Sequence, residues 1–273
     1  MDQAAGPAPF GTLLRRWRQH RGLSQLALSL EAEVSARHLS WLESGKAAPS
    51  RAMVLRLAER LDLPLRERNA MLVAAGFAPL YAERALAHPA LAPARAALQQ
   101  LLDAHEPAPA LAVDRHWNLV AHNRLVPLLL AAVAPALARP PVNVLRLSLH
   151  PQGLAPMIEH LPAWRRHVLG RLARQAQASA DPVLQALHTE LAALPVPAAA
   201  TPVALPDDAA IVPLVLNTAL GRLSFLTTVT TFGAPHEVTL AELAIETLLP
   251  ADAATAAALR AALAAQASDR PQP

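Results

Sequence analysis

Residues 24–50 read SQLALSLEAEVSARHLSWLESGKAAPS, and this stretch decides the fold of the N-terminal part of the chain. Ser24 and Ser35 each stand before a short run with helical character, and serine is a favoured N-cap residue because its hydroxyl accepts a bond from a free backbone N–H. Gly45 follows the second run, where glycine commonly ends a helix. The stretch therefore predicts two short helices joined by a tight turn around residues 32–34.

The second predicted helix has two faces of different character. Leu39 and Leu42 are three residues apart and are expected to point inward, whereas Arg37, His38 and Trp41 share the opposite side. A helix that is polar and cationic on its outer side suits the major groove of DNA, where arginine can donate two bonds to guanine and a large apolar group can contact a thymine methyl. The alternative is a small helical bundle with solvated arginines and no DNA partner.

The flanking sequence predicts three more helices and hence an all-α five-helix domain over residues 1–79. An apolar face at i, i+3, i+4 and i+7 begins at Phe10, Ser50 opens a fourth helix, and Pro64 separates it from a fifth at residues 65–75. Residues 1–78 carry 11 basic and 7 acidic residues, whereas the remainder carries 13 and 14. This concentration of positive charge at one end of the chain favours a nucleic-acid-binding end.

Residues 80–273 mix helical and strand patterns, so the chain is expected to be α+β overall. Proline residues punctuate the transition after residue 79. Strands are predicted at residues 110–114, 117–122, 211–218 and 222–232. Helices are predicted at residues 94–105, 123–134, 142–149, 154–177, 182–194, 239–248 and 251–264, and a proline- and alanine-rich loop at 195–207.

The N-terminal stretch resembles the XRE superfamily of helix-turn-helix regulators, which are related to the phage lambda repressor. The matching residues are Ser24-Gln25-Leu26-Ala27, Val34-Ser35, Leu39-Ser40-Trp41-Leu42-Glu43-Ser44-Gly45-Lys46 and Pro49-Ser50. The resemblance implies double-stranded DNA as the partner, and base reading by the third helix. The resulting candidate DNA-contacting residues are Gln25, Ser35, Ala36, Arg37, His38, Ser40, Trp41, Lys46 and Arg51.

The order of motifs in the rest of the chain is similar to the MmyB-like group of these regulators. The motifs are Ala75-Gly76-Phe77-Ala78-Pro79-Leu80-Tyr81, Val113-Asp114-Arg115-His116-Trp117-Asn118, Asn123-Arg124, Asn143-Val144-Leu145-Arg146, His150-Pro151-Gln152-Gly153-Leu154, Trp164-Arg165-Arg166, Gly221, Phe225 and Phe232-Gly233. The resemblance implies a PAS-like ligand-binding regulatory domain over residues 80–273. Fatty-acyl-type ligands are suspected for some members.

The composition of the second domain supports an apolar pocket more readily than a polar one, because ligand sites combine mostly apolar walls with a few placed polar groups. The candidate lining and head-group residues are Trp117, Asn123, Asn143, Trp164, Arg165, His167, Phe225 and Phe232. Each also has a structural interpretation: the tryptophans as core residues, the asparagines as helix caps, and Arg165 and His167 as solvated or core residues. A small apolar ligand such as a fatty acid is expected.

Other classes of protein are disfavoured. The chain has no cysteine, which removes thiolate chemistry and fits a cytoplasmic protein, and residues 1–12 lack the pattern of a signal peptide. The apolar run at residues 125–138 is too short for a membrane span. No enzyme motif is present, and no metal or other cofactor is expected. A homodimer is predicted because one helix-turn-helix reads few base pairs. The alternative function is an enzyme or a protein-interaction adaptor with an accessory helical domain.

Overall fold

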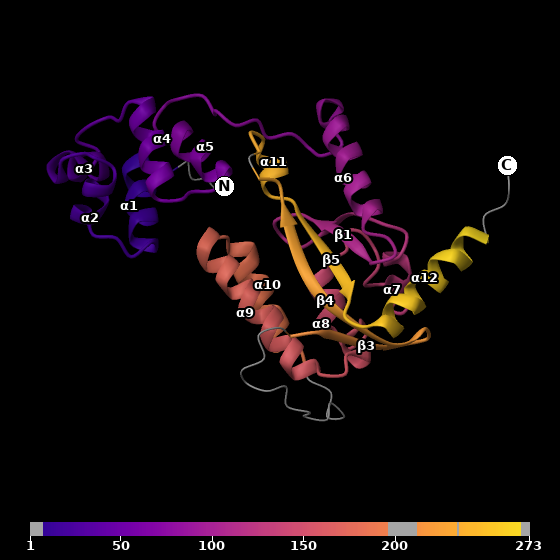
Figure 1. Cartoon of the computed structure of the whole chain (residues 1–273). Coiled ribbons are helices and arrows are strands. Elements are labelled where there is room, and N and C mark those ends of the chain that lie inside the picture. The colour runs from indigo at the N-terminus through magenta and orange to yellow at the C-terminus, as the bar shows by residue number, and fades with distance from the viewer. Residues whose placement is uncertain (1–7, 196–211, 234, 269–273) are drawn as a thin grey trace, which may run out of the picture. The chain divides into compact units, whose positions relative to one another are not determined.

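The computed structural model describes residues 8–195, 212–233 and 235–268 (Figure 1). These residues fall into two units with separate cores. The first contains residues 8–85 together with 235–241, and the second contains residues 86–195, 212–233 and 242–268.

Five helices form the first unit, as the sequence predicts: α1 Phe10–His20, α2 Gln25–Glu31, α3 Ala36–Glu43, α4 Arg51–Arg60 and α5 Leu65–Ala74. The hydroxyls of Ser24, Ser35 and Ser50 accept bonds from the backbone N–H groups three residues later and so begin α2, α3 and α4. The inward faces bury one apolar core, whose largest fully buried side chain is Trp17. Local signals in the sequence thus determine these elements.

A segment from the C-terminal half of the chain completes this first unit. It contains Glu237 and the short helix α11 Val238–Ala241, and Val238 is fully buried. The Glu237 carboxylate accepts a bond of 2.7 Å from the backbone N–H of Arg84, and the Val238 N–H donates to the Ala82 carbonyl at 2.8 Å. Asn69 of α5 holds the same strip of chain, because its side chain bonds the backbone of Leu80 and Tyr81.

The second unit is built on a five-stranded antiparallel sheet with the order β2-β1-β5-β4-β3. The strands are β1 Ala110–Val113, β2 Leu119–His122, β3 Leu214–Thr218, β4 Gly221–Thr231 and β5 Ala244–Pro250. The last strand in the sequence therefore lies in the centre of the sheet. This sheet with its helices confirms the expected α+β class.

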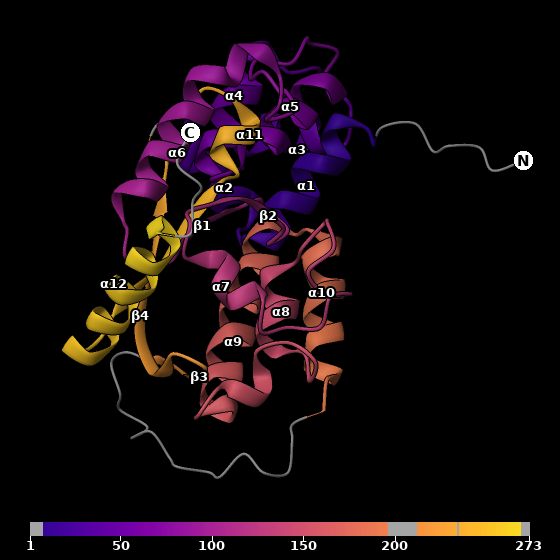
Figure 2. The same cartoon turned by 90° about the vertical axis from the view of Figure 1, so that its right-hand side faces the viewer.

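Helices cover both faces of this sheet. The views agree that α8, α9 and α10 lie on one side and α6 and α12 on the other (Figures 1 and 2). The main apolar core fills the space between the sheet and the first group. The elements are η1 Pro89–Leu91, α6 Ala92–Ala104, α7 Val126–Leu130, α8 Val144–Leu149, η2 Ala155–Met157, α9 Leu161–Ser179, α10 Pro182–Ala193 and α12 Ala253–Ser268.

Three sequence predictions need comment. The helix predicted at residues 239–248 is wrong, because the helix ends at Ala241 and β5 begins at Ala244. The helix predicted at 123–134 shrinks to α7, since Asn123 bonds the start of β1 instead of continuing a helix. The predicted loop at 195–207 lies outside the described residues except for residue 195.

No helix in the described parts of the chain is long and apolar enough to cross a membrane. The apolar run at residues 125–138 instead contributes α7 and buried core side chains, among them Leu125, Val126 and Val133.

Candidate functional site

The turn between α2 and α3 sets the angle at which α3 is presented. Ala32 is fully buried beneath the turn, and Glu33 adopts a left-handed backbone conformation with φ of 55°. The Val34 N–H then donates back to the Ser29 carbonyl at 2.9 Å. A non-glycine residue in this conformation is held there by its surroundings, so the turn has one defined geometry.

A buried ion pair fixes α3 against α1. The side chain of Glu43 is fully buried, and its two oxygens accept bonds from the Arg18 guanidinium at 2.5 and 3.0 Å. Gln25 donates to the same carboxylate at 2.8 Å and Arg15 at 3.3 Å. Burial alone would raise the pKa of Glu43. The hydrogen bonds from Arg18, Gln25 and Arg15 together lower the pKa by more than burial raises it, so the pKa lies below its usual range. The carboxylate therefore stays charged and ties three helices together.

The backbones of α1 and α3 also approach each other directly. A Cβ atom placed on Gly11 would come within 2.5 Å of the Leu42 carbonyl oxygen and 2.6 Å of that of Glu43. Only glycine fits this contact, since real Cβ atoms do not approach backbone so closely. Backbone packing and the ion pair thus make the outer face of α3 a rigid surface.

The outer face of α3 carries a preformed cation–aromatic pair. The Arg37 guanidinium lies 4.5 Å from the centroid of the Trp41 ring, and both side chains are exposed, Trp41 by 39%. His38 is half-buried beside them. This stacking limits the orientations of Arg37.

The other predicted DNA-contacting residues are exposed or half-buried. Ser35, Ala36, Lys46 and Arg51 are exposed and Ser40 is half-buried. Gln25 differs, because its amide donates to the buried Glu43 carboxylate. The Gln25 amide therefore helps to hold the Glu43 carboxylate in place.

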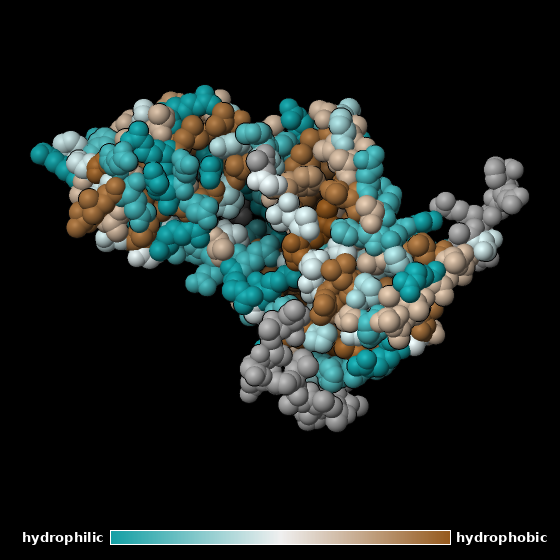
Figure 3. All heavy atoms as spheres, in the orientation of Figure 1, coloured by the Kyte–Doolittle hydropathy of each residue, from teal (hydrophilic) through white to brown (hydrophobic). Residues whose placement is uncertain are grey.

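Sequence reasoning missed two apolar residues on α2. Leu26 and Leu30, one helical turn apart, are 60% and 70% exposed. Hydrophobic side chains gather near α2 on the visible face in Figure 3, among hydrophilic ones over the other N-terminal helices. Exposed leucine side chains on α2 offer apolar contact to a partner. The sequence did carry a signal for this feature, because Leu26 and Leu30 are spaced i, i+4 and lie on a different face of the helix from the buried Leu28.

The second unit contains a partly open, mostly apolar cavity of about 90 Å³. Its walls come from the sheet and from α7, α8 and α9. The lining residues are Leu111, Trp117, Leu119, Val126, Leu129, Leu130, Val144, Leu145, Leu147, Ser148, Leu154, Trp164, Val168, Arg171, Leu214, Thr227, Glu246 and Leu248. Of the predicted ligand-binding residues, the structure brings Trp117 and Trp164 together in this wall.

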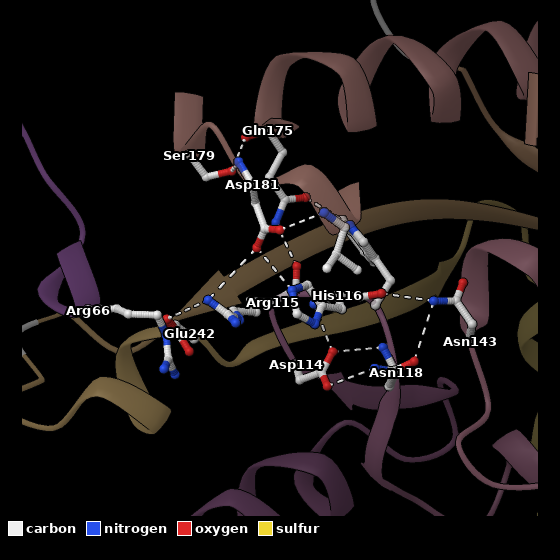
Figure 4. Close-up of polar contacts among 12 residues, drawn as sticks. Arg66, Asp114, Arg115, His116, Asn118, Asn143, Gln175, Ser179, Asp181 and Glu242 are labelled. Carbon is white, nitrogen blue, oxygen red and sulfur yellow. Dashed lines mark hydrogen bonds and ion pairs between the residues drawn. The ribbon is translucent and has the colours of Figure 1, made fainter. Parts of the chain in front are cut away.

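A tight turn after β1 places Trp117 against the cavity. The Asp114 carboxylate accepts bonds from the backbone N–H groups of His116 at 2.8 Å and Asn118 at 2.9 Å (Figure 4). This turn forces Trp117 to a φ of 69°, which is rare for a bulky residue. The indole N–H then donates to Gln175 of α9 at 2.8 Å. The strain is retained at a position that faces the cavity, as is common at binding sites.

Acidic and basic side chains brace the outside of the same turn. His116 Nε2 lies 2.9 Å from the Asp181 carboxylate, which also caps α10 (Figure 4). Burial raises the pKa of Asp181, but the bonds from His116 and the Val183 N–H give a net lowering. Arg115 lies 3.8 Å from both Asp181 and Glu242. Among the described residues no group of three or more histidine or acidic side chains could hold a metal ion.

The remaining predicted ligand-binding residues lie outside the cavity wall. Asn123 is buried and bonds the backbone of Leu102, Ala108, Ala110 and Leu125, and Asn143 caps α8. Arg165 donates to the carbonyls of Ala192 and Leu194. Phe225 is a fully buried core residue and Phe232 is half-buried beyond the end of β4. His167 stacks on Trp164 with ring centroids 5.4 Å apart, behind the wall.

The polar part of the cavity wall was not predicted. Arg171 forms an ion pair with Glu246 of β5, and its guanidinium lies 4.2 Å from the centroid of the Trp117 ring. Elsewhere in the lining, the Trp164 indole donates to Ser148 at 2.7 Å. The signal for Arg171 was present, because it follows Trp164 and Val168 at i+7 and i+3 on the inward stripe of α9.

One unit presents a rigid outward helix after a tight turn, and the other contains a mostly apolar cavity, a combination typical of a helix-turn-helix protein with a ligand-binding domain. Comparison with known families agrees: residues 9–71 match the helix-turn-helix domain, and residues 94–262 match the MmyB-like transcription regulator ligand binding domain. No curated protein matches the chain. Because the second match spans more than half of the chain, the chain belongs to the MmyB-like transcription regulators, and it is a DNA-binding transcription regulator.

Proposed function

We propose that the chain is a homodimeric, sequence-specific regulator that reads double-stranded DNA with α3 and senses a small, fatty-acyl-like apolar molecule in the cavity of its second unit. The observation that carries the reading role is the exposed Arg37–Trp41 pair on a helix held by the buried Glu43 network. Arg37 supplies a bidentate contact to guanine, and Trp41 supplies apolar contact to a neighbouring thymine or sugar. Ser40, Lys46 and Arg51 position the helix on the phosphate backbone.

Two copies are needed because one α3 covers only a few base pairs. A twofold dimer places two reading helices about 34–36 Å apart and so reads a pseudo-palindrome. Ligand binding in the cavity then favours one of two arrangements of the dimer by its difference in affinity for them. The nearly balanced charge of the second domain and its apolar cavity support separate roles for the two units, DNA binding in the first and ligand binding in the second.

Selection of duplexes from a random pool by the full chain tests the reading role. Enriched duplexes are expected to contain two related half-sites about one helical turn apart. R37A is expected to weaken binding by about 1–3 kcal/mol and to relax selection at one base position. R174A, which removes the same charge from an exposed position on α9, serves as the matched control and should leave selection unchanged.

Salt dependence separates the two kinds of contact. The logarithm of affinity should fall linearly with the logarithm of salt concentration, by about 0.9 for each phosphate neutralised. K46A is expected to lower that slope by about 1 without altering the selected sequence. Enrichment of no duplex, or an equal loss with R37A on all sequences, would contradict base reading by α3.

A further inference from the structure

The cavity of the second unit is apolar except at four residues. Its polar lining residues are Ser148, Arg171, Thr227 and Glu246, and the other lining side chains are aliphatic or tryptophan. Arg171 on α9 and Glu246 on β5 face each other and are 26% and 14% exposed. The head group of an amphipathic ligand must meet these groups, because an unpaired polar group against the apolar wall is unfavourable.

The two charged lining residues neutralise each other. Arg171 and Glu246 form an ion pair, and the flat face of the guanidinium rests on Trp117 at 4.2 Å. No further acidic or basic side chain belongs to the described lining, so the wall carries no net formal charge. A carboxylate that approached Arg171 would lie beside Glu246, and two like charges close together in a partly buried site repel each other strongly.

The wall offers hydrogen bonds that suit an uncharged polar group. The Ser148 oxygen accepts from the Trp164 indole at 2.7 Å, and its own proton has no acceptor within the described part of the chain, so it can donate to a ligand. Glu246 can accept from an N–H or O–H, and Arg171 can donate to a carbonyl. An amide, ester, lactone or ketone satisfies these groups without adding charge.

We propose that the cavity selects uncharged acyl derivatives over free carboxylates, with the Arg171–Glu246 pair as the selecting element. This inference rests on the proposed sensing function of the cavity. The volume of about 90 Å³ also limits size. At roughly 10–15 Å³ for each water-sized sphere, it holds about six to nine non-hydrogen atoms before the wall must yield. The preferred ligand therefore carries a short acyl chain or a compact ring.

Calorimetric titration of the full chain at pH 7.5 with butanamide, butanoate, hexanamide and hexanoate tests the selectivity. Each amide and its carboxylate match in size and differ in charge. The wild-type protein is expected to bind the amide at least tenfold more tightly. E246Q keeps the size of the side chain but leaves Arg171 without its counter-charge, so it should shift the preference at least tenfold towards the carboxylate.

Two further variants control the result. E159Q breaks the exposed ion pair with Arg222 outside the cavity and should leave the preference unchanged. S148A should weaken the amide more than the carboxylate if the hydroxyl donates to the ligand. Thermal melting of each variant confirms that it folds.

The outcomes distinguish this inference from the function on which it rests. Equal or tighter binding of the carboxylate by the wild-type protein, or no shift in E246Q, overturns the charge selectivity alone. Binding of none of the four probes overturns the cavity as a sensing site and the selectivity with it. DNA selection by the same preparation would remain intact in either case.

Discussion

Replacing Arg18 by methionine should destabilise the N-terminal unit by about 3 kcal/mol. The substitution removes two of the four hydrogen bonds to Glu43, those at 2.5 and 3.0 Å, and leaves a fully buried carboxylate with Gln25 and the half-exposed Arg15. Breaking a buried pair by removing one partner costs about 3–5 kcal/mol, and the remaining donors place this case at the lower end.

The loss is large relative to the stability of the unit. About 90 residues at 0.05–0.15 kcal/mol each give a total of roughly 4–14 kcal/mol. At about 4–8 °C for each kcal/mol in a domain of this size, the melting temperature should fall by roughly 12 °C or more. Scanning calorimetry of the full chain measures the fall. Hydrogen exchange followed by mass spectrometry assigns it, because amides of α1 and α3 should exchange about a hundredfold faster while those of the sheet do not change.

R15M is the matched control, since Arg15 donates to the same carboxylate at 3.3 Å but is 51% exposed. An exposed partner contributes little, so this variant should lose less than about 1 kcal/mol. The double variant R18M/E43M, which replaces both charges by apolar groups of similar volume, should regain much of the loss. Equal and small losses of stability in R18M and R15M would refute the claim that the buried Arg18–Glu43 ion pair stabilises the first unit.

Three further outcomes follow from single side chains. G11A should destabilise the first unit by about 1–3 kcal/mol, because its Cβ would meet the backbone of α3 at 2.5 Å. In G170A the new Cβ would have only an ordinary contact at 3.6 Å, and alanine favours a helix interior over glycine, so this variant should stabilise the second unit by about 0.5–1 kcal/mol. Thermal melts of both variants test the contrast. Burial, with Arg171 and Arg174 nearby, lowers the pKa of His167, so its contribution to stability is present above about pH 6.5 and lost as the pH falls through the lowered value. The melting temperature of the second unit should therefore drop between pH 7.5 and 5, and H167Q should reduce that drop; an unchanged slope would show that another group titrates.

The first unit could be predicted from sequence because its signals are local. Each serine cap, helix-ending glycine and apolar stripe lies within the element that it defines, and the structure places Ser24, Ser35 and Ser50 at the predicted caps. The outward side of α3 followed from the inward spacing of Leu39 and Leu42. The network around Glu43 did not follow, because a buried glutamate cannot be told from a solvated one without its partners.

The second unit was harder because its centre depends on contacts distant in sequence. Residues 239–248 are rich in alanine, leucine and glutamate, which favour helix, yet residues 244–250 pair with β1 and β4 on both edges. Pairing on both sides and burial outweigh helix propensity there. The same limit applies to the cavity: Trp117 and Trp164 were predicted as large apolar residues, whereas the pairing of Arg171 with Glu246 joins a helix and a strand 75 positions apart.

The docking of Glu237 and Val238 onto residues 82–84 has a practical consequence for dissection of this protein. A truncated fragment that stops at residue 85 would lack Glu237 and Val238. The Arg84 backbone N–H would lose its carboxylate acceptor, and the surface that buries Val238 would be exposed to solvent. An autonomous DNA-reading module would instead require residues 235–241 to be grafted behind residue 85 through a flexible linker. A chimaera made by a single crossover near residue 85 would take residues 235–241 from the other protein. These seven residues pack in the first unit, so a compatible chimaera must keep them from the same protein as residues 1–85.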